Sequence, residues 1–288
     1  MYLQKSVIKT IAKRKSVRTY EDRPITQEDY EKINKYLSIE ENLLGPLGRK
    51  IRFDVIQVSK NVSEKGIKLG TYGFIKNPKG YIVGMVENKN EALVEFGYTF
   101  EKLILFLTEL NIGTCWLGGT FTRNTFEKQI NLKNDEIIPC ITPIGYIPDK
   151  SRFFDKTLRK MINADKKKSW EDLFYYSGFE KKLTKETADK FKTPIEMVRL
   201  GPSASNKQPW RIVLSDSKDI CHFYLERTPN YSGNKLGFDM QRIDMGIAIC
   251  HFELACEELN IQGSWKREDP KIGLLSENTE YIMSWESK

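Results

Sequence analysis

A short basic motif near the start of the chain has the residue types that bind phosphate groups. Arg14, Ser16 and Arg18 alternate with Lys15 and Val17, so in an extended backbone the two guanidinium groups and the hydroxyl point to one side. Such groups hold phosphate oxygens by charge-assisted hydrogen bonds. Taken alone, a cluster of this kind is more often an ordinary solvated surface. The motif gains meaning only if a second ligand-binding segment accompanies it.

A polar turn far downstream is a candidate for that second segment. Gly201 and Pro202 predict a tight turn, and Pro209 and Trp210 start a strand after it. The short side chains between them can hydrogen-bond to nearby backbone or to the edge of a planar heterocycle; these are Ser203, Ser205 and Asn206. The alternative is an ordinary turn that uses these side chains only for itself.

An internal repeat indicates that the two motifs belong together. The segment from Glu95-Phe96-Gly97 to Trp116 aligns without a gap with the segment from Asp244-Met245-Gly246 to Trp265, at a constant shift of 149 residues (246 minus 97). This is far longer than the roughly 20 to 50 residues of a solenoid unit. We therefore expect two tandem halves, residues 1–164 and 165–288, packed as an intramolecular pseudo-dimer. The lysine-rich stretch 165–169 is the expected connector.

The local patterns predict a mixed α+β fold. Residues 96–107 and 247–259 have apolar side chains at helical spacing on much of their circumference, which predicts two central, buried helices. Residues 27–37 predict an amphipathic helix with Thr26 as its N-cap. Short β-rich runs surround these helices; they are residues 53–58, 81–86, 137–146 and 222–225.

Composition and charge exclude several classes of partner. Of the residues, 40% are hydrophobic and 30% charged, which suits a protein with a sizeable core. The apolar runs fall short of the about 20 residues that span a bilayer, and no secretory signal pattern is present. We therefore expect a cytoplasmic protein without a membrane partner. The net charge of +7 is spread among 39 acidic residues, which favours a phosphorylated small molecule over nucleic acid.

The cysteines and histidines do not form a metal-binding pattern. The five cysteines include no C-x-x-C pair, and only His222 and His251 accompany them, so no metal site is expected. Cys250 and Cys256 are expected to be small buried side chains. Cys250 and His251 cannot face each other because successive residues in a helix point about 100° apart. Both histidines are expected to be structural.

The two halves complement each other at the candidate motifs. Residues 45–48 of the first half keep the Gly-Pro turn but lack the serines and the asparagine, and nothing like the Arg14–Arg18 motif opens the second half between Trp170 and Pro194. A turn needs only the Gly-Pro pair, so the polar set should serve another purpose. We expect one surviving site between the halves, built from the basic motif of the first and the polar turn of the second.

Four motifs in this order resemble the FMN-dependent nitroreductase family, and more closely its duplicated single-chain branch. They are Arg-x-Ser-x-Arg near the N-terminus, Leu-Asn-Ile-Gly-Thr-Cys-Trp-Leu-Gly-Gly at 110–119, an Ile-Gly-Tyr strand at 144–146 and Pro-Ser-x-x-Asn-x-Gln-Pro-Trp at 202–210. Members of that family are usually homodimers that bind FMN across the subunit interface. The resemblance implies a nitroreductase-like fold in which this chain carries its own partner and acts as a monomer.

The resemblance also implies roles for individual residues. Arg14, Ser16 and Lys15 would contact the phosphate and ribityl of FMN, and Arg18 would approach the N1/C2 carbonyl edge and raise the reduction potential. Gly118 and Gly119 would lie near the N5/O4 edge, and the basic pair Lys150 and Arg152, which flank Ser151, would close on the phosphate. The residues implied to line the isoalloxazine are Pro202, Ser203, Ala204, Ser205, Asn206 and Gln208.

The implied activity is hydride transfer from NAD(P)H to a planar small-molecule acceptor such as a nitroaromatic or a quinone. The flavin would do the chemistry, so no catalytic side chain is expected, and one FMN per chain is predicted. Candidates for an aromatic gate are Tyr72, Phe74 and Phe121. Two alternatives share the same motifs: a relative that fragments its own flavin or dehalogenates an aromatic ring, and a protein that binds or stores flavin without turnover.

Overall fold

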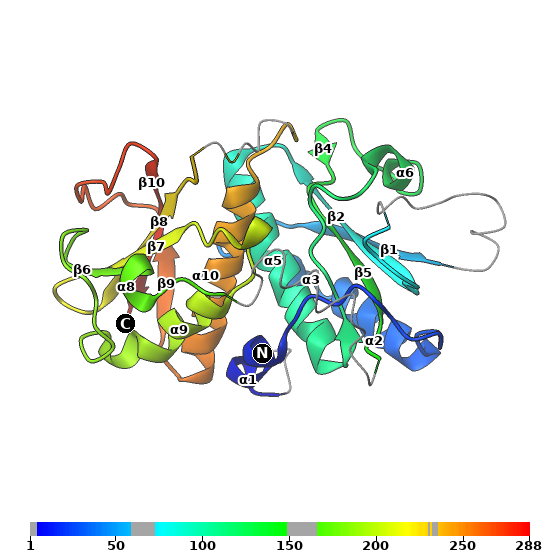
Figure 1. The fold of residues 1–288 in the computed structure, drawn as a ribbon, viewed down its shortest axis with the longest axis horizontal. Coiled ribbons are helices and arrows are strands. Elements are labelled where there is room, and N and C mark those ends of the chain that lie inside the picture. Colours follow the sequence, from blue (N-terminus) through cyan, green and yellow to red (C-terminus); the bar gives the residue numbers. More distant parts are fainter. Residues whose placement is uncertain (1–4, 59–72, 149–165, 230, 232–235) are drawn as a thin grey trace.

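The computed structural model describes residues 5–58, 73–148, 166–229, 231 and 236–288. Two β-sheets lie at opposite ends of the molecule, and two long helices pass between them (Figure 1). These helices are α5 (Asn90–Glu109) and α10 (Met240–Glu258). The mixed α+β class predicted from the sequence is confirmed.

The first sheet is antiparallel in each of its pairings. Its order is β1-β2-β5-β3, and β4 pairs with β2 beside this path. The strands are β1 (Arg52–Gln57), β2 (Gly80–Glu87), β3 (Ile112–Gly113), β4 (Glu136–Ile137) and β5 (Ile141–Tyr146). The strand expected over 137–146 is therefore split in two, around Pro139, which has no N–H to donate to a ladder.

The second sheet has the order β6-β7-β8-β10-β9. Its strands β6 and β7 are parallel, and its other pairs are antiparallel. The strands are β6 (Phe174–Tyr176), β7 (Trp210–Leu214), β8 (Ile220–Glu226), β9 (Gly263–Lys266) and β10 (Thr279–Ser287). Each sheet takes its strands from one of the two predicted halves. The boundary at 164 and 165 lies outside the described residues, so it stays a prediction.

Shorter helices cover the sheets and lead into the loops. The helix predicted over 27–37 is present as α2, and the Thr26 side chain caps it by accepting a hydrogen bond from the backbone N–H of Asp29. The helices are α1 (Val7–Lys13), α2 (Gln27–Ser38), α3 (Glu40–Leu43), α6 (Arg123–Glu127), α8 (Trp170–Leu173) and α9 (Lys192–Leu200), with 3₁₀ turns η1 (Asp189–Phe191) and η2 (Ala204–Asn206). No helix in the described ranges is long and apolar enough to cross a membrane.

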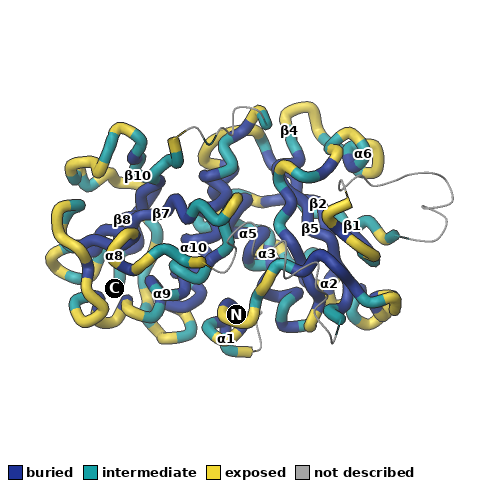
Figure 2. The backbone as a smooth tube through the Cα atoms, viewed as in Figure 1, coloured by how far each residue is buried: buried dark blue, intermediate teal, exposed yellow. Residues whose placement is uncertain are grey.

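The two central helices cross where glycine lets their backbones touch. A Cβ atom on Gly97 would lie 2.1 Å from the carbonyl oxygen of Ile243, and one on Gly246 would lie 2.1 Å from that of Val94. Adding 149 turns Val94 and Gly97 into Ile243 and Gly246, so each contact is the counterpart of the other. Isologous packing about a two-fold axis requires this exchange. Both helices are buried over most of their length (Figure 2), as their apolar spacing predicted.

Candidate functional site

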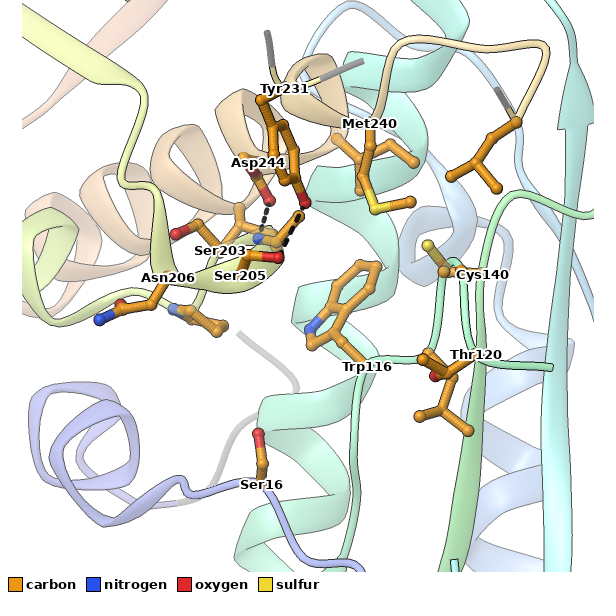
Figure 3. Close-up of a pocket in the computed structure, with 18 of the residues that line it drawn as sticks. Ser16, Trp116, Thr120, Cys140, Ser203, Ser205, Asn206, Tyr231, Met240 and Asp244 are labelled. Atoms are coloured by element: carbon orange, nitrogen blue, oxygen red, sulfur yellow. Dashed lines mark hydrogen bonds between the residues drawn. The ribbon is translucent and has the colours of Figure 1, made fainter. Parts of the chain in front are cut away.

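A cavity of about 390 Å³ lies between the polar turn, the basic motif and the loop that follows β3. Its volume falls within the roughly 300–1,000 Å³ range of ligand sites. Figure 3 shows Ser16 and Trp116 on one side of this space and Ser203, Ser205 and Asp244 on the other. The lining residues include Arg14, Ser16, Arg18, Trp116, Gly118, Gly119, Lys167, Pro202, Ser203, Ala204, Ser205, Asn206, Tyr231, Met240, Ile243 and Asp244.

The basic motif runs extended beside the end of β3. Ser16 forms a parallel β-bridge with Thr114, and the backbone N–H of Val17 donates to the Thr114 carbonyl at 2.8 Å. Successive side chains of an extended backbone point to opposite sides. Arg14, Ser16 and Arg18 therefore line the cavity, while Val17 is buried in the core. Lys15 points elsewhere: it lines a separate recess with Thr108 and Ile147. The structure therefore does not bring Lys15 to this cavity.

The loop after β3 lines the cavity with the backbone of two glycines, Gly118 and Gly119. A Cβ on Gly118 would lie 2.5 Å from Met240 Cε and 2.7 Å from its sulfur, so only glycine fits against α10 there without displacing that side chain. The Arg123 guanidinium donates to the Gly118 carbonyl, and its Nε donates to the Ile138 carbonyl at 3.1 Å. The Gly118-Gly119 backbone is thus held against the cavity.

The polar turn begins where α9 ends and is held by its own side chains. Ser203 Oγ accepts a hydrogen bond from the Gln208 N–H at 2.8 Å, and Asn206 Nδ2 donates to the Lys166 carbonyl at 2.9 Å. Ser205, Asn206 and Gln208 have φ values of 48°, 54° and 51°, a region that residues other than glycine seldom adopt. The expectation that the turn does not need its polar side chains is therefore wrong for Ser203, whereas Asn206 connects the turn to Lys166.

Gln208 has a structural position in place of the ring contact that the resemblance implied. Its side chain is buried, accepts a hydrogen bond from the Lys168 N–H at 2.8 Å and donates to the Asn206 carbonyl at 3.1 Å. It is not among the residues that line the cavity. It ties the turn to the residues that precede α8, which the spacing of the motif could not show.

Asp244 on α10 anchors the same turn, and sequence reasoning did not assign it a role. Its Oδ1 accepts a hydrogen bond from the Ala204 N–H at 2.9 Å, while its buried Oδ2 has no hydrogen-bond partner among the described residues. Burial raises the pKa of this carboxyl well above its usual range. The repeat contained a signal for it, because Asp244 aligns with Glu95, whose carboxylate accepts from the Leu47 N–H at 3.2 Å.

We predict that Asp244→Asn becomes more stable relative to wild type as the pH rises. The folded chain holds the Asp244 proton more tightly than the unfolded chain, so wild type loses stability as the pH rises above the unfolded pKa and toward the folded one. Asparagine keeps the acceptor for Ala204 and does not titrate. Thermal melts of both proteins should give similar Tm values at about pH 4 and a higher Tm for the variant at about pH 8. A difference in Tm that does not change with pH would contradict this.

Of the two aromatic gate candidates that the structure describes, one lies at the cavity. Phe74 lines it, whereas Phe121 packs edge-on against Phe126 in the core, with ring centroids 5.5 Å apart. The structure therefore does not bring Phe121 to the cavity, and Tyr72 lies outside the described residues. Trp116 and Tyr231 line the cavity instead, and Tyr231 Oη lies 3.2 Å from Ser205 Oγ.

Further cationic residues lie in or near the segment that joins the two halves. Lys150 and Arg152, expected to close on a phosphate, lie outside the described residues with Ser151. Lys167, which was assigned only to the connector, lines the cavity, and its ammonium group donates to the Gly201 carbonyl. The lysines at 166–168 are alike in sequence, and nothing in their spacing distinguishes the one that faces the cavity. The position of Lys167 could therefore not be predicted.

The internal repeat gives this cavity an equivalent position, found by shifting residue numbers by 149. That position is nearly closed. A space of only about 20 Å³ remains there, lined by residues that include Glu91, Val94, Glu95 and Arg267. These correspond to Met240, Ile243, Asp244 and Gly118 of the open cavity. Arg267 thus stands where the open cavity has a glycine, and the neighbouring Arg242 forms an ion pair with Glu280. Larger and charged side chains have filled the second space.

The cysteines and histidines are internal. All five cysteines are buried and free, as expected for Cys250 and Cys256. His222 Nδ1 lies 2.7 Å from Ser284 Oγ, and His251 contacts Glu101 and the Met197 carbonyl. Within the described part of the chain, no group of three His, Cys, Asp or Glu side chains could hold a metal ion.

Comparison with known proteins gives matches over most of the chain. A family model described as "Putative TM nitroreductase" matches residues 6–256. A crystal structure described as a "putative nitroreductase" from Thermotoga maritima MSB8 has 20% identity, covers 98% of this chain and 94% of that chain, and has a TM-score of 0.62. This similarity shows the fold. No curated protein matches the chain.

Other solved structures match about half of the chain. An FMN-dependent nitroreductase from Clostridium difficile R20291 has 22% identity, covers 50% of this chain and 88% of that chain, and has a TM-score of 0.39. A structure described as an oxidoreductase containing FMN has 14% identity, covers 52% and 82%, and has a TM-score of 0.43.

Proposed function

This chain belongs to the family described as "Putative TM nitroreductase", and on that premise we propose that it binds FMN in the cavity and transfers electrons from NAD(P)H to a planar small-molecule acceptor. The observation that carries the proposal is the meeting of two distant motifs. Arg14, Ser16 and Arg18 line the same cavity as residues 202–206. Cationic and hydroxyl groups on one side and a polar turn on the other suit a ligand with a phosphate at one end and a heterocycle at the other.

The chemistry of the lining residues fits FMN. Arg18 is largely buried, and its Nη1 has no hydrogen-bond partner among the described residues. A buried donor without a partner is costly, and a carbonyl oxygen on the pyrimidine ring of FMN would satisfy it. Arg14, Ser16 and Lys167 provide donors for a phosphate, and Trp116, Phe74 and Tyr231 provide aromatic surface for a planar ring.

The protein would contribute placement and charge, while bound FMN would supply the redox chemistry. Arg14 and Ser16 would hold the phosphate, and the turn at 202–206 would contact the ring. Arg18 would place a positive charge beside the pyrimidine carbonyl and so favour added negative charge on the ring. No side-chain nucleophile or acid is required by this assignment.

The closed second position supports one FMN per chain. The space of about 20 Å³ beside Glu95 and Arg267 is too small for any flavin, and the Arg242–Glu280 ion pair lies at its edge. The chain would therefore act as a pseudo-dimer with a single working site, in place of the usual two sites of a symmetric dimer.

A visible absorption spectrum tests the proposal. Purified protein saturated with FMN and freed of excess ligand should show a flavin spectrum with one FMN per chain. Anaerobic addition of NADH or NADPH should bleach this spectrum, and adding a quinone or a nitroaromatic should restore it. Absence of bound flavin would overturn the proposal. Bound flavin that neither nucleotide bleaches would favour a protein that stores or senses FMN without turnover.

A further inference from the structure

Glu101 on α5 is a fully buried carboxyl group directly behind two walls of the cavity. Its Oε2 accepts a hydrogen bond from Trp116 Nε1 at 2.7 Å, and its Oε1 lies 3.7 Å from Arg14 Nε. Trp116 and Arg14 both line the cavity, whereas Glu101 does not. One carboxyl group thus contacts an aromatic wall and a cation of the proposed phosphate site.

His251 on α10 connects the same carboxyl group to the other half of the molecule. Its Nε2 lies 2.9 Å from Glu101 Oε1, and its Nδ1 lies 2.9 Å from the Met197 carbonyl oxygen. Met197 belongs to α9, which ends immediately before Gly201, and a Cβ on Gly201 would lie 3.5 Å from His251 Nδ1. A continuous set of contacts therefore runs from Arg14 to the start of the polar turn.

The contacts of His251 determine how many protons the pair holds. A carbonyl oxygen can only accept, so Nδ1 carries a hydrogen that it donates to Met197. The contact between Nε2 and Glu101 then needs one more hydrogen, on either the imidazole or the carboxyl. In both cases the Glu101–His251 pair has no net charge, which suits two side chains with no exposed surface. The pair therefore adds no net charge beside Arg14.

We propose that Glu101 and His251 form a buried positioning pair that joins the two halves of the site. Glu101 orients Arg14 and Trp116 toward the ligand, and His251 connects that arrangement to α9 and the turn. The proposal rests on the proposed function, because it takes the phosphate of FMN as the group that Arg14 binds. It gives His251 a role in the site that its position beside Cys250 in the sequence did not suggest.

Glu101→Gln tests the positioning role without changing the net charge. The glutamine amide can donate to a neutral His251 and accept from Trp116, so both hydrogen bonds are kept and the pair still has no net charge. The carboxyl oxygen that faces Arg14 Nε is replaced by an NH2 group, which cannot accept from the guanidinium. Dissociation constants for FMN and for riboflavin, which lacks the phosphate, would be measured for wild type, Arg14→Ala, Glu101→Gln and the double variant. We expect Glu101→Gln to weaken FMN binding about tenfold and riboflavin binding less than about twofold.

The double variant decides between positioning and packing. If Glu101 acts through Arg14, Glu101→Gln should have no further effect on FMN binding once Arg14 is alanine. Equal losses for both flavins, or an undiminished effect in the Arg14→Ala background, would overturn the proposal. A wild-type protein that binds neither flavin would instead overturn the proposed function itself.

A second variant covers a Glu101→Gln protein that does not fold. In His251→Gln the amide can still donate to Glu101, but the pair then holds one hydrogen fewer. It therefore gains a net negative charge beside Arg14, which disfavours a phosphate there. FMN binding should then weaken about tenfold while riboflavin binding stays within about twofold. Unchanged FMN binding in this variant would also count against the pair.

Discussion

Replacing Arg14 with alanine should weaken FMN binding by roughly 10- to 150-fold. Arg14 lies at the cavity next to Ser16, and its side chain is only 10% exposed. Removing one charge-assisted hydrogen bond at such a site costs about 1.5–3 kcal/mol, which corresponds to that change in affinity. Riboflavin has no phosphate, so its binding should change much less. Fluorescence titration of both flavins against wild type and variant measures the difference.

Lys15→Ala is the matched control for this measurement. Lys15 also carries a positive charge and is adjacent in sequence, but it faces a separate recess with Thr108 and Ile147. Its removal should leave FMN affinity within about twofold, since an exposed charge outside the site contributes little. Similar losses for Lys15→Ala and Arg14→Ala would show that the basic motif acts only through its overall charge, and the assignment of Arg14 to the phosphate would then fail.

Replacing Gly246 with alanine should destabilise the protein by about 3 kcal/mol or more. The new Cβ would lie 2.1 Å from the Val94 carbonyl oxygen and 2.5 Å from the Tyr98 nitrogen. Both are backbone atoms of α5, so relief requires the two central helices to separate along their contact, and overpacking of this kind is costly. In a helix with free space, alanine would instead stabilise by up to about 1 kcal/mol. Thermal melting should show a fall in Tm on the order of 10 °C.

Gly97→Ala should behave like Gly246→Ala, because it meets the Ile243 carbonyl at the same distance. Gly273→Ala is the control, since a Cβ there has no heavy atom within 4 Å. It should leave Tm nearly unchanged. A mild effect at Gly97 with a severe one at Gly246 would contradict symmetric packing of the helices, and would weaken the case that the chain is a duplicated unit.

Short-range patterns predicted the parts of the site whose geometry depends only on the local backbone. Alternation along an extended strand was enough to place Arg14, Ser16 and Arg18 on one side. The same alternation excludes Lys15, which the family resemblance had included. Helical spacing likewise predicted that α5 and α10 are buried. In each case the pattern repeats with the period of the element, so no knowledge of distant residues is needed.

Positions that depend on the partner across a contact could not be predicted in this way. Gln208 belongs to the same motif as Ser203, but it turns toward the Lys168 backbone and away from the cavity. Phe121 has the chemistry of a gate residue and packs against Phe126 instead. The choice between these positions depends on which neighbours fill the space, and that information is spread over segments far apart in the chain.

The sequence by itself determined the composition of the two motifs, the period of the central helices and the 149-residue repeat, because each depends on local spacing or on comparison of one segment with another. Only the tertiary structure decided that Asp244 anchors the turn, that Glu101 meets His251 and that the second position is closed. Those facts depend on how α5 and α10 cross. The crossing is set by close packing of backbones at Gly97 and Gly246, a three-dimensional fit that no spacing along the chain expresses.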